Sequence, residues 1–586
     1  MVIGGEHLLK DCLEIFEKEY KSLGNRLITD SYVLSYGTYI LVKNFSNIDI
    51  LEVSKNNVDS TEDIYHKFCE LDYLSKLVSI DKSVDSKKII HSNNYLSFFV
   101  KKENLRPDKN NNVKLTEEII DNYYDALLNP RIKYKSDKRK KEIYDSIENK
   151  YGKVDENKLN KIRLWIKTNI FDLVESVKKD KNYLKIFFDE KIELYNDENQ
   201  KYLYPNIYNK NDFNVIIDGK NYGLPNDNMQ LNEKKPFLKL KTRIRNSTPY
   251  LISDDEVLLQ KAFFDYLMNK AANGEEVVYI SSEKGIHRKT DIPNEFSGYI
   301  LRIKKGKELE IHDFDTVVNL NTKIKRINVE CIIPIEYERH NLKPNLEIGY
   351  INNLIKLEKT IDTIFFNKFM CNSYFKEIKN INLSDLVLRD ILIRHREGLY
   401  TWFYKGRDNI VKQTFSNYSM GIIENSIKNN NYIRAKEQYN LRIAIINYFH
   451  GGSNMADKIK VISESLFEKI NSIKTKCIQS DEEYYFAVGQ LASYFISKNK
   501  SKNKNHSLIN PILNAQNRKK VMLEIEKLFK KYNYDISYDN NRRFKNLYSM
   551  IVGYEAEEKK VNRDLLIGGY LYYNLIYTKS EENENE

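Results

Sequence analysis

The hydrophobic pattern of this chain changes once, near Pro344, and that change limits the folds it can adopt. Up to about residue 343, short runs of β-branched and aromatic residues alternate with amphipathic helical stretches. Beyond it, apolar residues recur at helical spacing and Pro511 is the only further proline, so long helices can form without interruption. We therefore predict a multidomain chain, with a mixed α+β N-terminal domain over residues 1–343 followed by an all-α C-terminal helical bundle.

Size and composition suit a protein with several cores. The chain has 586 residues, of which 41% are hydrophobic, and domains commonly take roughly 100–200 residues each. In the helical half we expect a connecting region at 344–454, a bundle at 455–579 and a disordered acidic tail at 580–586. We find neither an apolar run long enough to span a membrane nor a signal-peptide pattern. The five cysteines are scattered singly, so we expect a cytoplasmic protein without disulfides, bound metal or another cofactor.

Local patterns predict several individual elements. A polar turn at Ser92–Asn94 separates two apolar runs, and we expect it to form an exposed loop. Asp254 or Asp255 is positioned to cap a helix that runs to about Ala272. Further helices are predicted at 8–23, 61–79 and across most of 115–200, and strands around Gly37 and at 215–217, 276–280, 298–303, 308–314 and 329–337.

The distribution of positive charge indicates a polyanionic partner. The formal net charge is +11, although an AT-rich genome would also enrich lysine. Lys239, Lys241, Arg243 and Arg245 alternate along the chain, so on a strand they would share one face. The lysines at every second position from 498 to 504 indicate a loop between two helices, which can contact phosphates. Arginines beside an aromatic residue suit phosphate contact with base stacking. The candidate phosphate contacts are Lys239, Lys241, Arg243, Arg245, Lys498, Lys500, Lys502, Lys504, Arg518, Lys519, Lys520, Arg542, Arg543 and Lys545.

Catalytic motifs are missing from the sequence. It contains no GxxxxGK[ST] phosphate loop, no HExxH and no EF-hand pattern. The nearest approach to a metal site is His312, Asp313 and Asp315, within a strand-like run that no second ligand cluster follows. We therefore expect a protein that is not an enzyme. A hydrolase that uses these three residues stays open as an alternative.

Several stretches resemble the large subunits of type I-B Cascade, the RNA-guided effector complex of CRISPR systems. They are patterns of helices and basic residues, and they span both ends and the middle of the chain. They are IIHSNNYLSFFVKK (89–102), KTRIRNSTPYLISDDEVLLQKAFFDYL (241–267), FAVGQLASYFISKNKSKNKNHSLINPILNAQN (486–517), NNRRFKNLYSMIVGYE (540–555) and DLLIGGYLYYNLIY (564–577). Some members carry a cysteine-rich zinc-binding insertion, which the single cysteines here do not match.

The resemblance implies a non-catalytic role in antiviral defence. In such subunits the α/β part recognises the protospacer-adjacent motif in target double-stranded DNA, beside the subunit that holds the crRNA handle. The helical part, resembling the Cascade small subunit at 455–579, lies against the backbone subunits and stabilises the R-loop. The guide RNA supplies sequence specificity. The implied partners are crRNA, target DNA, the other Cascade subunits and a recruited helicase-nuclease, with no membrane. A nucleic-acid-binding structural or regulatory protein of a phage or mobile element is the leading alternative.

Small polar loops are the candidates for contact with the motif or the crRNA handle, from the minor-groove side. We favour Asn93 and Asn94, because adjacent amides offer donors and acceptors and a basic pair follows them. We expect Asn94→Ala to weaken binding to duplex DNA that carries the motif. The candidate contacts are Asn93, Asn94, Lys101, Lys102, Asn273, Gly274, Lys284, Gly285 and Arg288.

The family also implies a small subunit translated from an internal start in the same gene. Met455 follows two glycines, Gly451 and Gly452, whose codons can spell a purine-rich ribosome-binding element. Translation from Met455 would give a helical product of 132 residues, with Met420 as the alternative start. The glycines are equally compatible with a helix C-cap and a loop.

Overall fold

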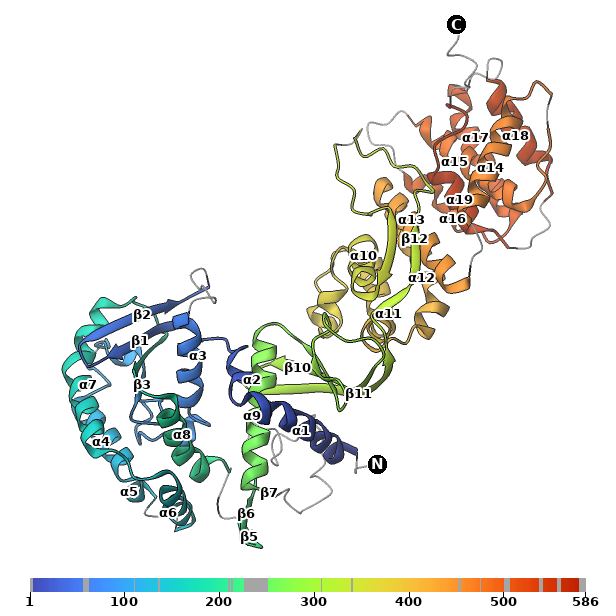
Figure 1. The fold of residues 1–586 in the computed structure, drawn as a ribbon. Helices are drawn as coiled ribbons and strands as arrows, with labels where there is room; N and C mark the ends of the chain where they lie inside the picture. Colours follow the sequence, from blue (N-terminus) through green and yellow to red (C-terminus); the bar gives the residue numbers. More distant parts are fainter. Residues whose placement is uncertain are drawn as a thin grey trace. The chain divides into compact units, whose positions relative to one another are not determined.

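The chain forms two compact units, seen in a computed structural model. The first comprises Met1–Ile292 and Phe296–Val317, and the second Pro293–Glu295 and Val318–Glu586. A mixed α+β region is followed by a run of helices, which confirms the predicted fold class (Figure 1). The structure describes residues 4–55, 63–109, 111–134, 138–208, 211, 214–225, 251–306, 308–338, 341–451, 455–474, 476–499, 506–536, 541–555 and 560–578.

The first unit combines helices with three sheets. Its helices are α1 (Gly4–Leu23), α2 (Arg26–Thr29), α3 (Asp63–Ser75), α4 (Glu117–Leu128), α5 (Pro130–Lys133), α6 (Lys138–Tyr151), α7 (Glu156–Ser176), α8 (Ile192–Asn206) and α9 (Asp254–Ala272). Its strands are β1 (Gly37–Lys43), β2 (Asn47–Val53), β3 (Ser97–Lys101), β4 (Tyr183–Phe188), β5 (Val215–Ile217), β6 (Lys220–Gly223), β7 (Ile252–Ser253), β8 (Val277–Ser281), β9 (Gly285–His287), β10 (Phe296–Lys305) and β11 (Leu309–Leu320).

The first sheet has the order β2-β1-β4-β3, with β1 and β4 parallel and the other neighbours antiparallel. Alternate residues of a strand point to opposite faces. On one face Phe187 packs on Phe68 of α3, and on the other Phe188 packs on Trp165 of α7. Phe98 meets two tyrosines of α4 on the same side as Trp165. The sheet is therefore a middle layer between α3 and the pair α4 and α7 (Figure 1).

The second sheet, β11-β10-β8-β9, is covered by α1 and α9. Phe16 of α1 packs against Phe263 and Tyr266 of α9. The hydroxyl of Tyr299 on β10 donates to Asp11 of α1 over 2.6 Å. These contacts join the N-terminal helix to strands more than 250 residues later in the chain, so the first unit folds as one body.

In the parts of the second unit that the structure describes, the regular elements are helices and one two-stranded sheet. Its elements are β12 (Lys323–Val329), β13 (Gly349–Asn353), α10 (Leu354–Phe366), α11 (Leu386–Lys405), α12 (Asn409–Lys428), α13 (Tyr432–His450), α14 (Met455–Asn471), α15 (Asp481–Ser497), α16 (Asn510–Leu513), α17 (Arg518–Tyr532), α18 (Arg542–Gly553) and α19 (Arg563–Leu571). One hydrophobic core joins α12 and α13 to the helices α14 to α19.

Helices α15 and α19 cross at very short range, because glycines replace side chains at the contact. A Cβ on Gly489 would lie 2.6 Å from the backbone nitrogen of Tyr570, and one on Gly569 would lie 2.9 Å from the carbonyl carbon of Phe486. Gln490 then reaches across and donates to the Gly569 carbonyl over 2.6 Å. Close backbone approach of this kind requires glycine.

Arg442 ties α12, α13 and α19 together inside this unit. Its side chain is 1% exposed, and it donates to Asp564 of α19 from Nε and Nη2 at 3.0 and 2.9 Å. Its remaining donors reach the carbonyl of Ser416 and the hydroxyls of Ser416 and Ser419 on α12. A buried guanidinium is tolerated because each of its donors has a partner.

Most of the predicted elements are present, with three corrections. The helices at 8–23 and 61–79, the largely helical stretch 115–200 with β4 inside it, and the strands at 215–217, 276–280, 298–303 and 308–314 are confirmed. Three expectations were wrong: the units divide at Val317 rather than near 343, the strand expected at 329–337 is Lys323–Val329, and the cap of α9 is Ser253 rather than Asp254 or Asp255.

The causes of these differences are physical. The YLKIFF run of β4 is buried on both faces, so it lacks the alternation that marks a half-buried strand. The Ser253 hydroxyl accepts from the backbone of Glu256, and the acids that follow it occupy the first turn, where they favour the helix dipole. Pairing of β12 with β13 places both strands in the second unit.

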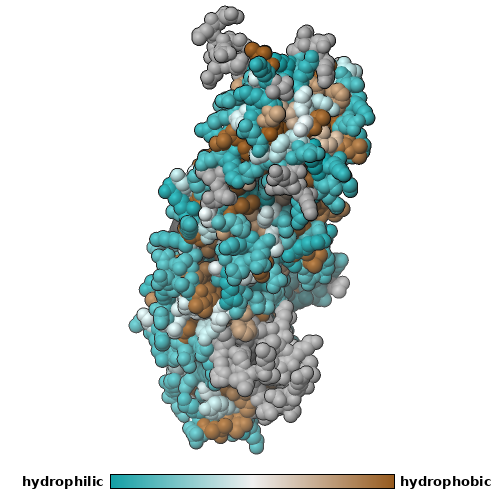
Figure 2. Space-filling model, turned by 90° about the vertical axis from the view of Figure 1, so that its right-hand side faces the viewer, coloured by the Kyte–Doolittle hydropathy of each residue, from teal (hydrophilic) through white to brown (hydrophobic). Residues whose placement is uncertain are grey.

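Hydrophilic residues dominate the face in Figure 2, and hydrophobic residues lie there in separate patches. Within the described ranges, every helix is too short or too polar to cross a bilayer.

Candidate nucleic-acid interface

One end of the helical bundle gathers basic residues from segments far apart in the sequence. There the end of α15 meets the start of α18 and the segment 576–578 that follows α19. We call the cations Lys498, Arg542, Arg543 and Lys545 at this place the basic end. Lys498 follows the last residue of α15, and the other three lie in the first turn of α18. The structure therefore brings two of the predicted basic segments together.

Aromatic and polar side chains fix Lys498 at the basic end. Its ammonium lies 4.9 Å from the ring centroid of Tyr494 and 5.8 Å from that of Tyr577. Tyr494 in turn accepts a hydrogen bond from Asn541, the cap of α18, over 3.0 Å. Partial burial opposes the lysine charge, but the two phenol groups outweigh it and raise the pKa of Lys498. Lys498 is therefore a positioned cation at neutral pH.

The two arginines of α18 form a like-charge pair. Arg543 is half-buried over the ring of Phe467, and its Nε donates to Asn471 over 2.5 Å while its Nη1 donates to the carbonyls of Ile576 and Thr578. Among the described residues these partners are all neutral. Burial, and then the charge of the exposed Arg542, lower the pKa of Arg543. A phosphate placed here would relieve the repulsion.

The cations at 518–520 do not belong to the basic end. Arg518 begins α17, donates to the carbonyl of Tyr554 and lies 5.9 Å from the ring of Tyr484, near the start of α15. Lys519 and Lys520 beside it are exposed. Tyr484 and Lys498 are separated by a helical rise on the order of 20 Å. The 498–520 segment is therefore divided between opposite ends of α15.

Seven predicted phosphate contacts lie outside the described residues. They are Lys239, Lys241, Arg243, Arg245, Lys500, Lys502 and Lys504.

The favoured amide loop is buried, so the expectation that Asn93 and Asn94 are exposed was wrong. Both side chains are 1% exposed. Asn93 donates to the carbonyls of Leu74 and Lys76 and to Asn199. Asn94 accepts from the backbone of Leu96 over 2.9 Å and from the Ser97 hydroxyl over 3.2 Å. These amides satisfy a buried turn before β3 and are not available to DNA.

The basic pair at the end of β3, Lys101 and Lys102, is divided between an exposed and a buried side chain. Lys102 has no exposed side-chain surface and pairs with Asp180 at 3.2 Å. Lys101 is 42% exposed and lies 3.9 Å from Glu103. Only Lys101 can contact a partner, and a neighbouring acid offsets its charge.

The other two polar loops of the first unit lie together. Asn273 and Gly274 end α9, with Gly274 at φ +82°, while Lys284, Gly285 and Arg288 belong to the β8–β9 hairpin. Arg288 pairs with Glu275 at 3.6 Å, directly after Gly274. At Gly285, a side chain would collide with Glu19, whose carboxylate accepts from the backbone of Ile286. The surface is exposed at Asn273 and Arg288, and two acids reduce its positive charge.

The alternative hydrolase residues do not converge. Adjacent residues of β11 point to opposite faces, which separates His312 from Asp313 and Asp315. His312 lies beside Glu310 at 2.6 Å and beside Arg302 of β10. The residues that the structure describes hold no group of three or more His, Cys, Asp or Glu side chains that could bind a metal.

A further basic cluster was missed in the sequence. On β12, Lys323, Lys325 and Arg326 are exposed, and the guanidinium of Arg326 lies 3.1 Å from the ring centroid of Tyr350 on β13. A signal was present, because the sequence between Asp315 and Glu330 contains three cations and no acid.

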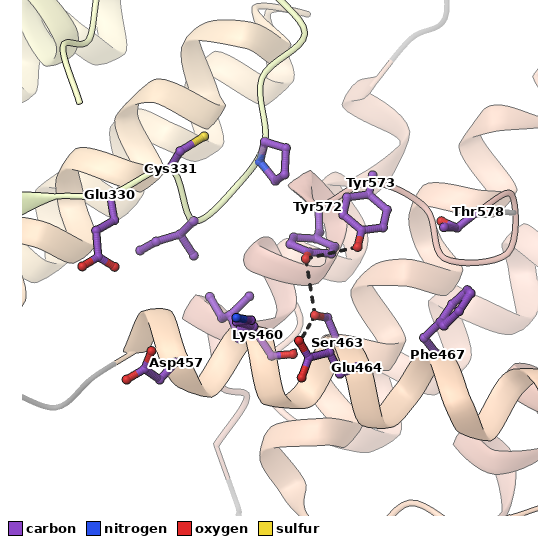
Figure 3. A pocket seen from close by; sticks show the side chains of 13 residues that line it. Glu330, Cys331, Asp457, Lys460, Ser463, Glu464, Phe467, Tyr572, Tyr573 and Thr578 are labelled. Atoms are coloured by element: carbon purple, nitrogen blue, oxygen red, sulfur yellow. Dashed lines mark hydrogen bonds between the residues drawn. The ribbon is translucent and has the colours of Figure 1, made fainter. Parts of the chain in front are cut away.

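A different cavity, of about 700 Å³, has the opposite character. Glu330 and Cys331 lie on one side, α14 contributes Asp457 and Glu464, and Tyr572 and Tyr573 close another side (Figure 3). The Ser463 hydroxyl donates to Tyr572 over 3.4 Å. Burial and the hydroxyl of Tyr572 raise the pKa of Tyr573 to about 12. Three carboxylates outnumber the one lysine of the lining, Lys460, so the cavity disfavours a phosphate backbone.

The chain matches no protein-family model, no curated protein and no solved structure.

Proposed function

We propose that this chain is a non-catalytic nucleic-acid-binding subunit, acting as the large subunit of a type I-B CRISPR Cascade in the cytoplasm. The observation that carries the proposal is the like-charge pair Arg542–Arg543 beside Lys498 at the basic end. Cations held next to each other by neutral partners gain most from a polyanion. Tyr577, which is 54% exposed, adds aromatic surface of the kind that accompanies single-strand binding.

Backbone contacts of this kind suit a subunit that leaves sequence reading to a guide RNA. Lysine and arginine contacts to phosphates position a strand without identifying its bases. In a Cascade, the basic end would hold the displaced DNA strand and stabilise the R-loop. The confirmed order of a mixed α+β region and a helical region fits the arrangement that the resemblance implies.

Recognition of the protospacer-adjacent motif is assigned to the first unit, with crRNA and double-stranded DNA as ligands. Burial removes Asn93, Asn94 and Lys102 from the candidates. The surface formed by Asn273, Gly274, Lys284 and Arg288 is the place where we expect the motif or the crRNA handle to bind. Backbone, handle-binding and small subunits and a recruited helicase-nuclease are the proposed protein partners.

A tagged pull-down from the native host, with RNA sequencing and mass spectrometry, tests the assignment. Guide RNAs of uniform length together with several Cascade proteins are the expected result. Recovery of the chain alone, or with nucleic acid of mixed length, would contradict the Cascade assignment. The latter result would favour the second candidate, a nucleic-acid-binding protein of a phage or mobile element, with the basic end as a general phosphate site.

A further inference from the structure

The two-stranded sheet of the second unit has one buried face and one exposed face. Ile327 of β12 and Ile351 of β13 are 1% and 3% exposed, because β12 packs on α13 and β13 packs on α10. Tyr350 and Asn352, on either side of Ile351, are exposed, as the alternation of a strand requires. We call the exposed side of this sheet the open face. Its residues are Lys325, Arg326, Asn328, Tyr350 and Asn352.

Two neighbouring cations stand on the open face. The pairing of β12 with β13 is irregular between Lys323 and Ile327, and an irregularity of this kind re-aims the side chains of the strand. Lys325 and Arg326 are both exposed there, and neither forms an ion pair with a residue that the structure describes. Adjacent positive charges without an acid between them favour a polyanion as the partner.

An aromatic ring fixes the direction of one of these cations. The guanidinium carbon of Arg326 lies 3.1 Å from the ring centroid of Tyr350, which is 53% exposed. At this distance the planar guanidinium must lie flat on the ring. Its N–H edge can then donate to phosphate oxygens, and its outer face can stack on an unpaired base.

Amide oxygens beside the cations add acceptors to the open face. Asn352 follows Tyr350 by two positions, and within the described ranges its side chain has no hydrogen-bond partner. Asn328, opposite Tyr350 in the strand register, donates its N–H to Glu330 and keeps its oxygen as an acceptor. A phosphate has no proton to give to such oxygens, whereas the 2′-hydroxyl of ribose does, and DNA lacks that hydroxyl.

We propose that the open face binds single-stranded RNA, with a phosphate at Lys325 and Arg326, a base on the guanidinium plane and a 2′-hydroxyl at Asn352. This rests on the proposed nucleic-acid-binding function and deepens it, because it gives the chain a surface that distinguishes RNA from DNA. Phosphate contacts alone cannot make that distinction. The RNA must be unpaired, since a paired base could not reach the guanidinium.

The test measures binding of the full chain to fluorescent 12-mers of uridine and of deoxyuridine, which differ only in the 2′-hydroxyl. We expect the RNA to bind about fivefold more tightly, as one additional hydrogen bond would cause. Asn352→Leu should remove that preference and leave binding of the DNA 12-mer unchanged. Asn47→Leu, at an exposed position on strand β2 of the first unit, is the matched control and should change neither.

Variants of Arg326 test the cation and its stacking separately. Arg326→Ala should weaken both 12-mers and lower the slope of log K against log salt by about 0.7. Arg326→Lys should keep the slope but still weaken both, because an ammonium cannot stack as a plane. Ultraviolet cross-linking of a 12-mer that carries 4-thiouridine, followed by mass spectrometry, should identify Tyr350.

The possible results separate this proposal from the proposed function. Equal binding of the two 12-mers, or a preference for RNA that persists in Asn352→Leu, would overturn the assignment of the open face. A preference that Lys498→Ala removes and Asn352→Leu does not would overturn it as well, and would place the RNA at the basic end. Failure of both 12-mers to bind would contradict the proposed function itself.

Discussion

The crossing of α15 and α19 makes one substitution unusually informative. In Gly569→Ala, the new methyl group would lie 2.9 and 3.0 Å from the carbonyl carbon and Cα of Phe486, and still closer to the carbonyl oxygen. The obstacle is backbone in the middle of a helix, so no side-chain rotation can relieve it. The helices must separate, which stretches the hydrogen bond from Gln490 to the Gly569 carbonyl.

The expected cost follows from three contributions. Overpacking against backbone costs about 1–3 kcal/mol. Loss of the Gln490 hydrogen bonds to the carbonyls of Gly569 and Tyr573 adds roughly 1 kcal/mol each. Alanine returns about 1 kcal/mol through its greater helix propensity. The stability of the bundle should therefore fall by about 2–4 kcal/mol.

Hydrogen exchange of peptides from α15 and α19 measures this local change in the full chain. A loss of 2–4 kcal/mol corresponds to exchange about 30- to 800-fold faster, at about 1.4 kcal/mol per factor of ten. Gly553→Ala is the matched control, because a Cβ on Gly553, the last residue of α18, meets nothing within 4 Å. Equal exchange in the two variants would refute the argument that the glycines set the helix contact.

Three further predictions concern charge and burial. Replacing Lys498 and Arg542 by alanine should lower the salt dependence of single-strand binding, by about 0.7 in the slope of log K against log salt for each cation. The control Lys412→Ala, on an exposed part of α12, should leave the slope unchanged. An equal slope in all variants would exclude the basic end as the site of phosphate contact. Asn94→Ala should destabilise β3 by about 1–3 kcal/mol in hydrogen exchange, because it leaves the buried N–H of Leu96 without an acceptor; unchanged protection would contradict the structural role. Burial opposes ionisation of Asp72, but Lys185 at 2.5 Å outweighs it and lowers the pKa of Asp72, so this ion pair should stabilise the first unit above about pH 4 and lose that effect as the pH falls. Urea unfolding, followed by the fluorescence of Trp165 in a Trp402→Phe background, should show that Lys185→Met lowers the free energy of unfolding most at neutral pH. A decrease in the free energy of unfolding that does not depend on pH would contradict this prediction.

Periodicity predicted the elements in which buried and exposed residues alternate along the sequence. Helix α1 buries one stripe, and strands β10 and β11 have exposed and buried residues along their length, so both patterns are visible in the sequence. The β4 strand is buried throughout, and its apolar run cannot be distinguished from a helix segment by period alone.

The candidate site was predicted less well, because exposure is a property of the tertiary fold. The sequence around Asn93 and Asn94 has the composition of a surface turn, yet the Leu74 carbonyl and the Ser75 hydroxyl of α3 accept from these amides and make the turn part of the core. Conversely, nothing local to residues 498 and 543 indicates that they meet; the contacts of Tyr494 and of residues 576–578 bring them together.

A product translated from Met455 would lack part of the hydrophobic core of the second unit. The properties of that shorter product therefore give a test of the internal start. Met455 is the first residue of α14, so the product would keep α14 to α19 whole. It would lose α13, whose Tyr439 donates to the Asp564 carbonyl over 2.8 Å and whose Arg442 pairs with the Asp564 carboxylate.

Residues buried under α13 in the full chain, such as Ile459 and Tyr570, would then lie on an exposed apolar face. A face of this kind needs a partner, so the purified 455–586 product should self-associate in light scattering and show faster hydrogen exchange in α19 than the full chain.

In cells that express the chain with a C-terminal tag, Met455→Leu should remove a short band from a Western blot and keep the full-length band. The structure gives Gly451 its own reason to be present, since at φ +72° it ends α13 and donates to the Asn447 carbonyl. The glycine therefore does not argue for a ribosome-binding element by itself, and persistence of the short band in Met455→Leu would exclude this start.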